Sequence, residues 1–278
     1  MNSRFASCLR ATVLVGLFTA SIAPPLCAGD LSQQLAIHTY TLRNLTFEQA
    51  IEFAQRHGIK ELQLTSNHLD PKSAPEEWVK KKAALDAAGV HAYTLGVAST
   101  SMKPEENRRL FELAKVMGMK LVVVEPADFR IWDNLEQLAK EFDIRVAVHN
   151  HGIKSLYGNP AVVKQVIGHR DARLGVCLDV GWITSSNLDA AKVYREYEGR
   201  VFDLHLKDKI VKKTEQGDDV ALDTEIGAGH ANLKGLFAEL QKSGYTGHLA
   251  LETDGDNFAK SPDDFIDHAK KFVETNGK

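Results

Sequence analysis

The feature that most constrains the fold is an alternation that repeats eight times from residue 35 onward. Each unit has a short run of aliphatic and β-branched residues, a few polar residues, and a segment with helical periodicity. The predicted strands cover residues 35–40, 60–65, 91–97, 120–125, 145–150, 174–181, 201–208 and 248–254. The predicted helices cover residues 46–58, 75–89, 104–118, 134–143, 160–171, 188–199, 231–244 and 262–277.

Eight β-then-α units without a composition break predict an α/β fold with a single (β/α)8 TIM barrel. Several predicted helices begin at Pro or after a capping residue and stop at Gly, as helix ends favour. The alternative is an open doubly wound sheet, which predicts a Gly-rich phosphate-binding turn after the first strand. Residues 39–49 contain no such turn, so the sequence favours the barrel.

The N-terminal segment has the layout of a secretory signal peptide. Two arginines precede an apolar run over residues 11–23, and prolines and small residues follow it. We expect cleavage after Ala28; a lipoprotein signal at Cys27 is disfavoured by the prolines just before it. The predicted domains are therefore a signal peptide at 1–28 and a barrel at 29–278, secreted or periplasmic and without membrane attachment after cleavage.

Composition excludes two other classes of protein. The 278 residues are 44% hydrophobic and 26% charged, which suits a globular domain with a substantial core. A net charge of -3 implies no basic surface for nucleic acid. Outside the predicted signal peptide, Cys177 is the one remaining cysteine, so no disulfide framework is expected.

Polar residues occur late in several predicted strands. Side chains alternate between the two faces of a strand, so aliphatic residues that face the helices leave their neighbours facing the barrel interior. In this way Val146 and Val148 place His149 inside, and Leu249 and Leu251 place Glu252 inside. The inward polar set comprises Glu125, His149, His151, Asp179, His205, Lys207 and Glu252.

The seventh predicted strand has the same alternation. Asp203, His205 and Lys207 alternate with Phe202, Leu204 and Leu206, so we expect the three polar residues inside and the three apolar residues outside. Ionisable groups on such a face are costly unless they are paired or bind a ligand. An ion pair of Lys207 with Asp203 or Asp208 is the structural alternative to a functional role, and Asp203 is expected to pair within the barrel.

Carboxylates and imidazoles that converge from different strands suit one divalent metal ion: Mn²⁺, Mg²⁺, Co²⁺ or Zn²⁺. Each residue alone has a simpler interpretation, since an Asp at a strand end often caps a helix and an inward His is often only hydrogen-bonded. The coincidence of several strands favours a metal site at the carboxyl ends, where barrel enzymes build their active sites.

Four motifs carry a resemblance to a known family. The segments CLDVGW, DLHLKD, IGAG and GYTGHLALE together resemble the xylose-isomerase-like superfamily of sugar isomerases, epimerases and related lyases. The resemblance implies Asp179, His205 and Glu252 as metal ligands. Members similar to tagatose epimerase have a fifth-strand glutamate as a further ligand, and His149 stands there instead. Trp182 replaces a histidine found in many members.

The resemblance also implies the chemistry. A metal-bound carbonyl and hydroxyl acidify the neighbouring C–H, a base removes the proton, and the enediolate leads to isomerisation, epimerisation or elimination. The predicted residues fall into three groups. The catalytic group is Glu252, His149, Lys207 and Glu125. The metal-binding group is Asp179, His205, Glu252 and His151. The substrate-binding group is His38, Gln63 and Trp182. Asp208 is expected to orient Lys207.

The predicted partner is a small carbohydrate, free or glycosidically linked, and a homo-oligomer is compatible with the sequence. A lyase that cleaves 3-keto-glycosides is one specific form of the hypothesis; a non-catalytic carbohydrate-binding barrel and a metal-dependent hydrolase are the alternatives. The DNA-repair endonuclease branch is disfavoured by the sixth-strand sequence and the charge. IGAG before a helix is a weak candidate for an anion contact, and tight backbone turning better explains its glycines. Residues 209–225 are predicted to form a long polar loop, either a lid or partner contact or a mobile surface segment.

Overall fold

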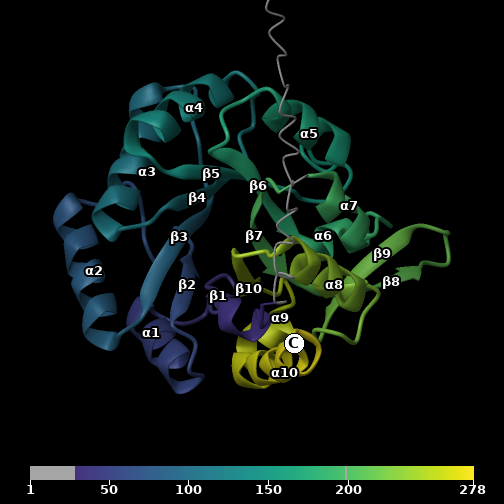
Figure 1. The fold of residues 1–278 in the computed structure, drawn as a ribbon. Coiled ribbons are helices and arrows are strands. Elements are labelled where there is room, and N and C mark those ends of the chain that lie inside the picture. The colour runs from purple at the N-terminus through teal and green to yellow at the C-terminus, as the bar shows by residue number, and fades with distance from the viewer. Residues whose placement is uncertain (1–28, 198) are drawn as a thin grey trace, which may run out of the picture.

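The first strand closes the barrel. β1 (Leu35–His38) pairs in parallel with β2 (Glu61–Leu64) on one side and with β10 (His248–Leu251) on the other. Figure 1 shows the resulting ring of strands, enclosed by helices, in the computed structural model. The structure describes residues 29–278 except residue 198. The predicted (β/α)8 TIM barrel is confirmed, with strand order β1-β10-β7-β6-β5-β4-β3-β2.

The remaining elements follow the predicted alternation. The other barrel strands are β3 (His91–Ala98), β4 (Leu121–Val124), β5 (Arg145–His149), β6 (Leu174–Asp179) and β7 (Val201–Leu206). The helices of the outer layer are α1 (Phe47–Arg56), α2 (Pro75–Ala88), α3 (Pro104–Met117), α4 (Ile131–Phe142), α5 (Pro160–Gly168), α7 (Ala190–Glu196), α8 (Leu233–Ser243) and α10 (Pro262–Asn276). A short 3-10 helix, η1 (Leu31–Gln34), precedes β1.

Local sequence signals set the helix ends. Thr46 and Gln49 form a capping box at the start of α1, each side chain bonding the other residue's backbone N–H. Proline occupies the first turn of α2, α3, α5 and α10, where its missing N–H costs nothing. Gly89, Gly118 and Gly244 end α2, α3 and α8 in the left-handed conformation.

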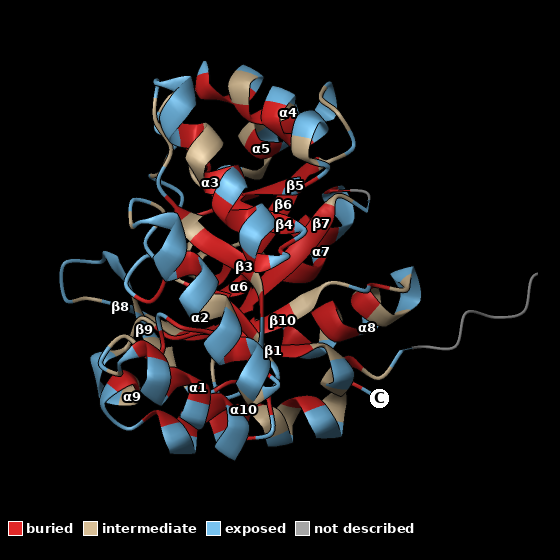
Figure 2. Cartoon of the chain, turned by 90° about the vertical axis from the view of Figure 1, so that its left-hand side faces the viewer, coloured by how far each residue is buried: buried red, intermediate tan, exposed pale blue. Residues whose placement is uncertain are grey.

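Apolar side chains form two layers. The larger one lies between the strands and the helices, and Figure 2 shows it as buried strands and inner helix faces beneath exposed outer helix faces. The smaller one fills the interior of the barrel. Its residues are Leu121, Val123, Ala147, Cys177 and Phe202. The polar residues at the strand ends therefore rest on an apolar floor.

Phe202 lies on the opposite side from the predicted one. It packs inside the barrel, because the register between β6 and β7 shifts where Val176 pairs with Val201 and Cys177 pairs with Asp203. This irregularity places Phe202 and Asp203 both toward the interior. Gly175 leaves the room for the ring, since a Cβ there would come within 2.6 Å of Phe202 Cζ.

The predicted loop over residues 209–225 is instead mostly a hairpin. β8 (Asp208–Lys213) and β9 (Asp219–Thr224) pair antiparallel, and Figure 1 shows them projecting beyond the ring of helices. Two short helices were also not predicted, α6 (Val180–Ser185) after β6 and α9 (Asp256–Lys260) after β10. These additions all follow barrel strands, at the end where the polar residues converge.

The predicted signal peptide lies outside the described residues. Among residues 29–278 without residue 198, no helix has the length and apolar character needed to cross a membrane.

The packing around Gly175 gives a stability prediction. We expect Gly175→Ala to lower the free energy of unfolding by about 3 kcal/mol, because the added methyl group overpacks the Phe202 ring and the Arg200 carbonyl. Gly168→Ala is the matched control: Gly168 is exposed at the end of α5, and a Cβ on it would have no neighbour within 4 Å. It should be neutral or stabilise by about 0.5–1 kcal/mol. Urea denaturation of both variants measures the difference; equal stabilities would contradict the proposed packing role.

Candidate metal centre and active site

Four predicted polar residues meet at the carboxyl ends of neighbouring strands. His149 ends β5, Asp179 ends β6, His205 lies near the end of β7, and Glu252 directly follows β10. All four are buried, and Asp179 and His205 are 0% exposed. The inward orientation expected from strand alternation brings them together at one place.

The distances between them describe a compact cluster. His205 Nδ1 lies 2.7 Å from Glu252 Oε2 and 3.6 Å from Asp179 Oδ2. His149 Nε2 lies 3.4 Å from the same Asp179 oxygen. Asp179 Oδ1 has a different task, because it accepts a hydrogen bond from Trp182 N and caps α6. One carboxylate thus serves as both helix cap and site residue.

The donor set fits a divalent cation. Asp179 Oδ2, His205 Nδ1 and Glu252 Oε2 are buried, and none has a hydrogen-bond partner of acceptable geometry in the described part of the chain. His149 presents Nε2 to the cluster, because its Nδ1 faces Glu125 Oε2 at 3.6 Å. Metal bonds of about 2.1 Å place neighbouring ligand atoms about 3–3.5 Å apart. The His149–Asp179 and His205–Asp179 distances lie at or near that range, and mixed N/O ligands suit Zn²⁺, Mn²⁺ and Co²⁺.

His38 borders the same cluster from β1. Its Nδ1 lies 3.5 Å from Glu252 Oε1, and its Nε2 lies 3.1 Å from the Gly96 carbonyl oxygen. Burial lowers the pKa of His38 to about 3, so the ring is neutral, and donation from Nε2 leaves Nδ1 as the acceptor of a hydrogen bond from Tyr40 N at 3.3 Å. Two overlapping groups have metal-ligand spacing: His149 with Asp179 and His205, and His38 with His205 and Glu252.

Lys207 lies between the two carboxylates. Its Nζ is 3.1 Å from Asp179 Oδ2, 3.3 Å from Glu252 Oε2 and 2.8 Å from Asp254 Oδ1. Burial by itself raises the pKa of Asp179 and Glu252, yet Lys207 and the neighbouring histidines hold both pKa values well below their usual range. The suggested ion pairs of Lys207 with Asp203 or Asp208 are wrong.

Asp208 does not orient Lys207, because its carboxylate binds backbone. Oδ2 accepts hydrogen bonds from Gly227 N at 3.0 Å and Gly229 N at 2.9 Å, and Oδ1 accepts one from Ala231 N at 3.0 Å. The IGAG segment therefore encloses an internal carboxylate. Its N–H groups are satisfied by the protein itself, which explains the segment without an external anion.

Glu125 contacts His149, the last residue of β5, and His151, which lies just after that strand. Its Oε2 is hydrogen-bonded to His151 Nδ1 and lies 3.6 Å from His149 Nδ1. Burial raises the pKa of Glu125, but the two histidines outweigh it and lower the pKa to about 2; the same contact raises the pKa of His151. A carboxylate with so low a pKa is a weak base, so the geometry favours Glu125 as the partner that orients the histidines.

A pocket of about 710 Å³ opens above the cluster. Its lining includes His38, His149, His151, Trp182 and Glu252, together with residues of β9. That volume lies within the range of about 300–1,000 Å³ typical of small-molecule sites. Trp182, predicted to bind substrate, borders this pocket with Lys209 Nζ 4.9 Å from its ring centroid.

Gln63 is placed differently from the other predicted substrate-binding residues. It is 0% exposed and lies next to His205, with Oε1 3.1 Å from His205 Nε2. The side chain thus contacts the histidine and does not border the 710 Å³ pocket.

A row of charges that was not predicted from the sequence leads from the cluster to the hairpin. Asp254 Oδ2 lies 3.0 Å from Lys209 Nζ, which lies 2.6 Å from Asp223 Oδ1. Lys209 and Asp223 fell in the segment predicted to be a loop. The spacing of Lys207 and Lys209, two positions apart, was the sequence signal that could have placed both side chains on the same side of the chain.

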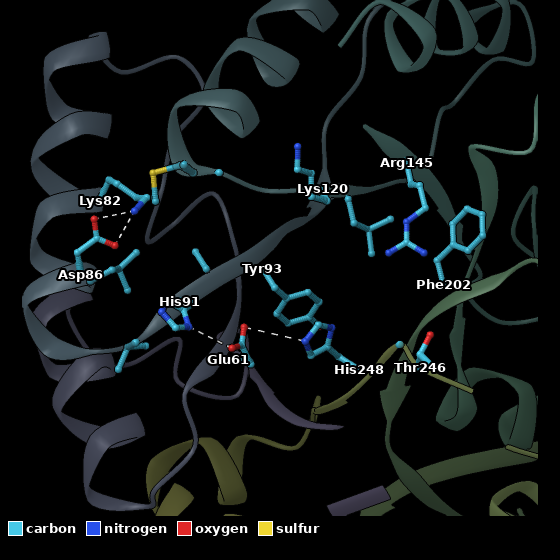
Figure 3. A pocket seen from close by; sticks show the side chains of 17 residues that line it. Glu61, Lys82, Asp86, His91, Tyr93, Lys120, Arg145, Phe202, Thr246 and His248 are labelled. Atoms are coloured by element: carbon cyan, nitrogen blue, oxygen red, sulfur yellow. Dashed lines mark hydrogen bonds and ion pairs between the residues drawn. The ribbon is translucent and has the colours of Figure 1, made fainter. Parts of the chain in front are cut away.

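A second pocket, of about 420 Å³, lies at the opposite end of the barrel. Figure 3 shows it bordered by Glu61, His91, Arg145 and His248, each the first residue of its strand. Barrel enzymes assemble their sites at the carboxyl ends of the strands, so the 710 Å³ pocket is the candidate active site.

Comparison with known proteins agrees with this geometry. The sequence profile described as xylose isomerase-like TIM barrel matches residues 51–275. This chain belongs to that family. Proteins of the family act on small sugar-like substrates, and the family fold together with its curated relatives indicates a sugar-modifying enzyme.

The relatives cover most of the barrel. An inosose dehydratase of Clostridium perfringens is 24% identical over 269 residues, 82% of this chain and 89% of the relative. The crystal structure of an uncharacterized protein from Parabacteroides distasonis is 26% identical with a TM-score of 0.68, covering 87% of this chain and 98% of the other. The crystal structure of the IOLI protein with a zinc atom is 16% identical with a TM-score of 0.67, covering 88% and 98%.

The cluster geometry predicts how replacing one carboxylate oxygen of Asp179 by an amide nitrogen changes metal affinity. We expect Asp179→Asn to weaken Mn²⁺ or Zn²⁺ binding by at least about 100-fold, because the variant keeps a capping oxygen for α6 but loses the charged Oδ2. Asp189→Asn is the matched control, since Asp189 caps α7 in the same way, away from the cluster. Isothermal titration of both variants measures the affinities; equal values would remove Asp179 from the ligand set.

Proposed function

We propose that this chain is a divalent-metal-dependent sugar lyase acting on a keto-sugar or keto-polyol. The observation that carries the proposal is the meeting of His149, Asp179, His205 and Glu252 beside the 710 Å³ pocket. Relatives named inosose dehydratase support elimination, because a dehydratase expels water and an inosose is a cyclic polyol with a ketone. A 3-keto-glycoside would undergo the same reaction with an alcohol as leaving group.

The residues that would hold the metal are Asp179, His205, Glu252 and His149, with His38 beside them. A bound divalent cation would supply Lewis-acid stabilisation of negative charge on the carbonyl oxygen of the substrate. Zinc in the IOLI structure supports a metal in this fold. Mn²⁺, Mg²⁺, Co²⁺ and Zn²⁺ all remain candidates.

His151 is a candidate base for the C–H beside the ketone. Glu125 holds its Nδ1, which leaves Nε2 as the ring nitrogen for a substrate proton. The imidazole borders the pocket, with its centroid 5.4 Å from that of Trp182. Glu252, with Oε1 directed toward His38, is the second candidate.

Lys207 is the candidate for stabilising developing negative charge. Its ammonium is buried between Asp179, Glu252 and Asp254, and these carboxylates raise its pKa well above the usual value against the effect of burial. It therefore stays protonated. Lys207 does not itself border the 710 Å³ pocket, so its charge would stabilise a substrate oxyanion from beneath the cluster.

His149 favours elimination over epimerisation. The family resemblance implies that epimerases similar to tagatose epimerase use two carboxylates, one from the fifth strand and one from the eighth. Here the fifth strand supplies His149 and the last strand supplies Glu252. Elimination needs one base and a protonated leaving group: the proton leaves the carbon beside the ketone, the next C–O bond breaks, and the substituent departs as water or alcohol.

The reaction class can be tested with an inosose and a 4-nitrophenyl 3-keto-glycoside in deuterated water with Mn²⁺. We expect an unsaturated ketone and release of water or nitrophenol. Deuterium in recovered substrate or in an isomeric ketose without release would indicate isomerisation or epimerisation. Release of nitrophenol together with a saturated keto-sugar would indicate hydrolysis. The absence of both deuterium exchange and release would favour a non-catalytic binding protein.

The same assay tests Glu252. We expect Glu252→Gln to lower kcat/KM by at least about 1,000-fold, because both metal binding and proton transfer depend on that carboxylate. Glu61→Gln is the control, since Glu61 lies at the opposite end of the barrel in the pocket of Figure 3. Wild-type activity of Glu252→Gln would contradict the assignment.

We also propose that the enzyme is exported, on the layout of residues 1–28. The full chain expressed in a Gram-negative host should be recovered from the periplasm with Gly29 as its first residue. N-terminal sequencing of the fractionated protein tests this; an uncleaved cytoplasmic chain would contradict export.

A further inference from the structure

Gln63 lies beneath the metal-ligand cluster, inside the barrel. It is the third residue of β2 and is fully buried. Its Oε1 lies 3.1 Å from His205 Nε2 and 3.1 Å from Tyr93 Oη. Gln63 thus touches the ring nitrogen of His205 that faces away from the carboxylates of the cluster.

The two nitrogens of His205 have opposite surroundings. Nδ1 faces Glu252 Oε2 at 2.7 Å and Asp179 Oδ2 at 3.6 Å, whereas Nε2 faces the Gln63 carbonyl oxygen. A neutral imidazole carries one proton, and the other nitrogen has the lone pair that binds a metal. An amide oxygen can only accept, so Gln63 favours the tautomer with hydrogen on Nε2 and the lone pair on Nδ1.

The amide itself is held in place from the floor of the barrel. The Tyr93 hydroxyl donates to Gln63 Oε1 and also lies 3.0 Å from Asp203 Oδ1. Figure 3 shows the Tyr93 ring beside His248, and the two rings stack with centroids 3.8 Å apart. Gly96 makes room for the amide, because a Cβ there would come within 2.8 Å of Gln63 Nε2.

We propose that Gln63, supported by Tyr93, is a positioning residue that fixes the tautomer and ring orientation of His205 for metal binding. This inference rests on the proposed metal site and replaces the predicted contact of Gln63 with substrate. Residues that hydrogen-bond a metal-binding histidine typically change metal affinity by about 10–100-fold when they are removed.

The test compares Gln63→Met with Gln63→Glu in the full mature chain. Methionine keeps the size but removes the acceptor, and we expect Zn²⁺ affinity to fall by about 10–100-fold. Glutamate keeps an acceptor oxygen and should retain more of the affinity. Gln34→Met is the matched control, because Gln34 is a half-buried glutamine that bonds the Tyr245 carbonyl far from the cluster.

Nitrogen-15 NMR of the Zn²⁺-loaded protein supplies a readout that a merely structural role would not move. In the wild type we expect a His205 Nε2–H proton protected from solvent exchange; in Gln63→Met that proton should exchange at least about tenfold faster, because its acceptor is gone. Tyr93→Phe is the second variant if Gln63→Met does not fold, and it should shift the exchange rate in the same direction.

The outcomes separate the two proposals. Wild-type protein that binds Zn²⁺, with unchanged affinity and N–H exchange in Gln63→Met, would overturn the positioning role and leave the metal site standing. In the case that Gln63→Met does not fold, an unchanged exchange rate in Tyr93→Phe would overturn it as well. A wild-type protein that binds no divalent metal would overturn both proposals.

Discussion

The structure depends on how two buried carboxylates are neutralised. Asp179 ends β6 and Glu252 directly follows β10, on either side of β7, and neither could remain ionised in this buried place without positive charge nearby. Lys207 supplies one such charge between them, and a divalent cation at the proposed metal site would supply a second. Gly181 reflects the same constraint, since a Cβ on it would lie 2.6 Å from Lys207 Cγ. The glycine at this position near the start of α6 leaves the space that the Lys207 side chain occupies.

From this centre, charges alternate outward to the hairpin. Lys207 contacts Asp254, Asp254 contacts Lys209, and Lys209 contacts Asp223 of β9. The hairpin is therefore tied to the active site by partly buried ion pairs, which are screened less than exposed ones. Because β9 also borders the 710 Å³ pocket, the contacts that hold the lysine also shape the pocket wall.

The residues at the end of the fifth strand support the proposed elimination. The family resemblance implies a ligating glutamate at the position of His149 in epimerases similar to tagatose epimerase. The contacts of Glu125 with His149 and His151 lower the pKa of Glu125 to about 2. The site thus has one carboxylate, that of Glu252, placed to act as ligand and base. A second carboxylate, that of Glu125, orients His151. This asymmetry suits loss of a proton and a leaving group better than reversible transfer between two faces.

The amino-acid sequence by itself determined the eightfold alternation of strands and helices, the capping and glycine signals near the helix ends, and the inward position of His149, Asp179, His205 and Glu252. Those features are local, because capping residues and strand alternation act over a few positions. The partners of the site residues depended on the tertiary structure. Gln63 meets His205 across 142 residues of sequence, Asp208 binds the turn at 227–231, and one register shift turned Phe202 inward. Contacts between distant strands are fixed by barrel closure and register, and no local pattern encodes either.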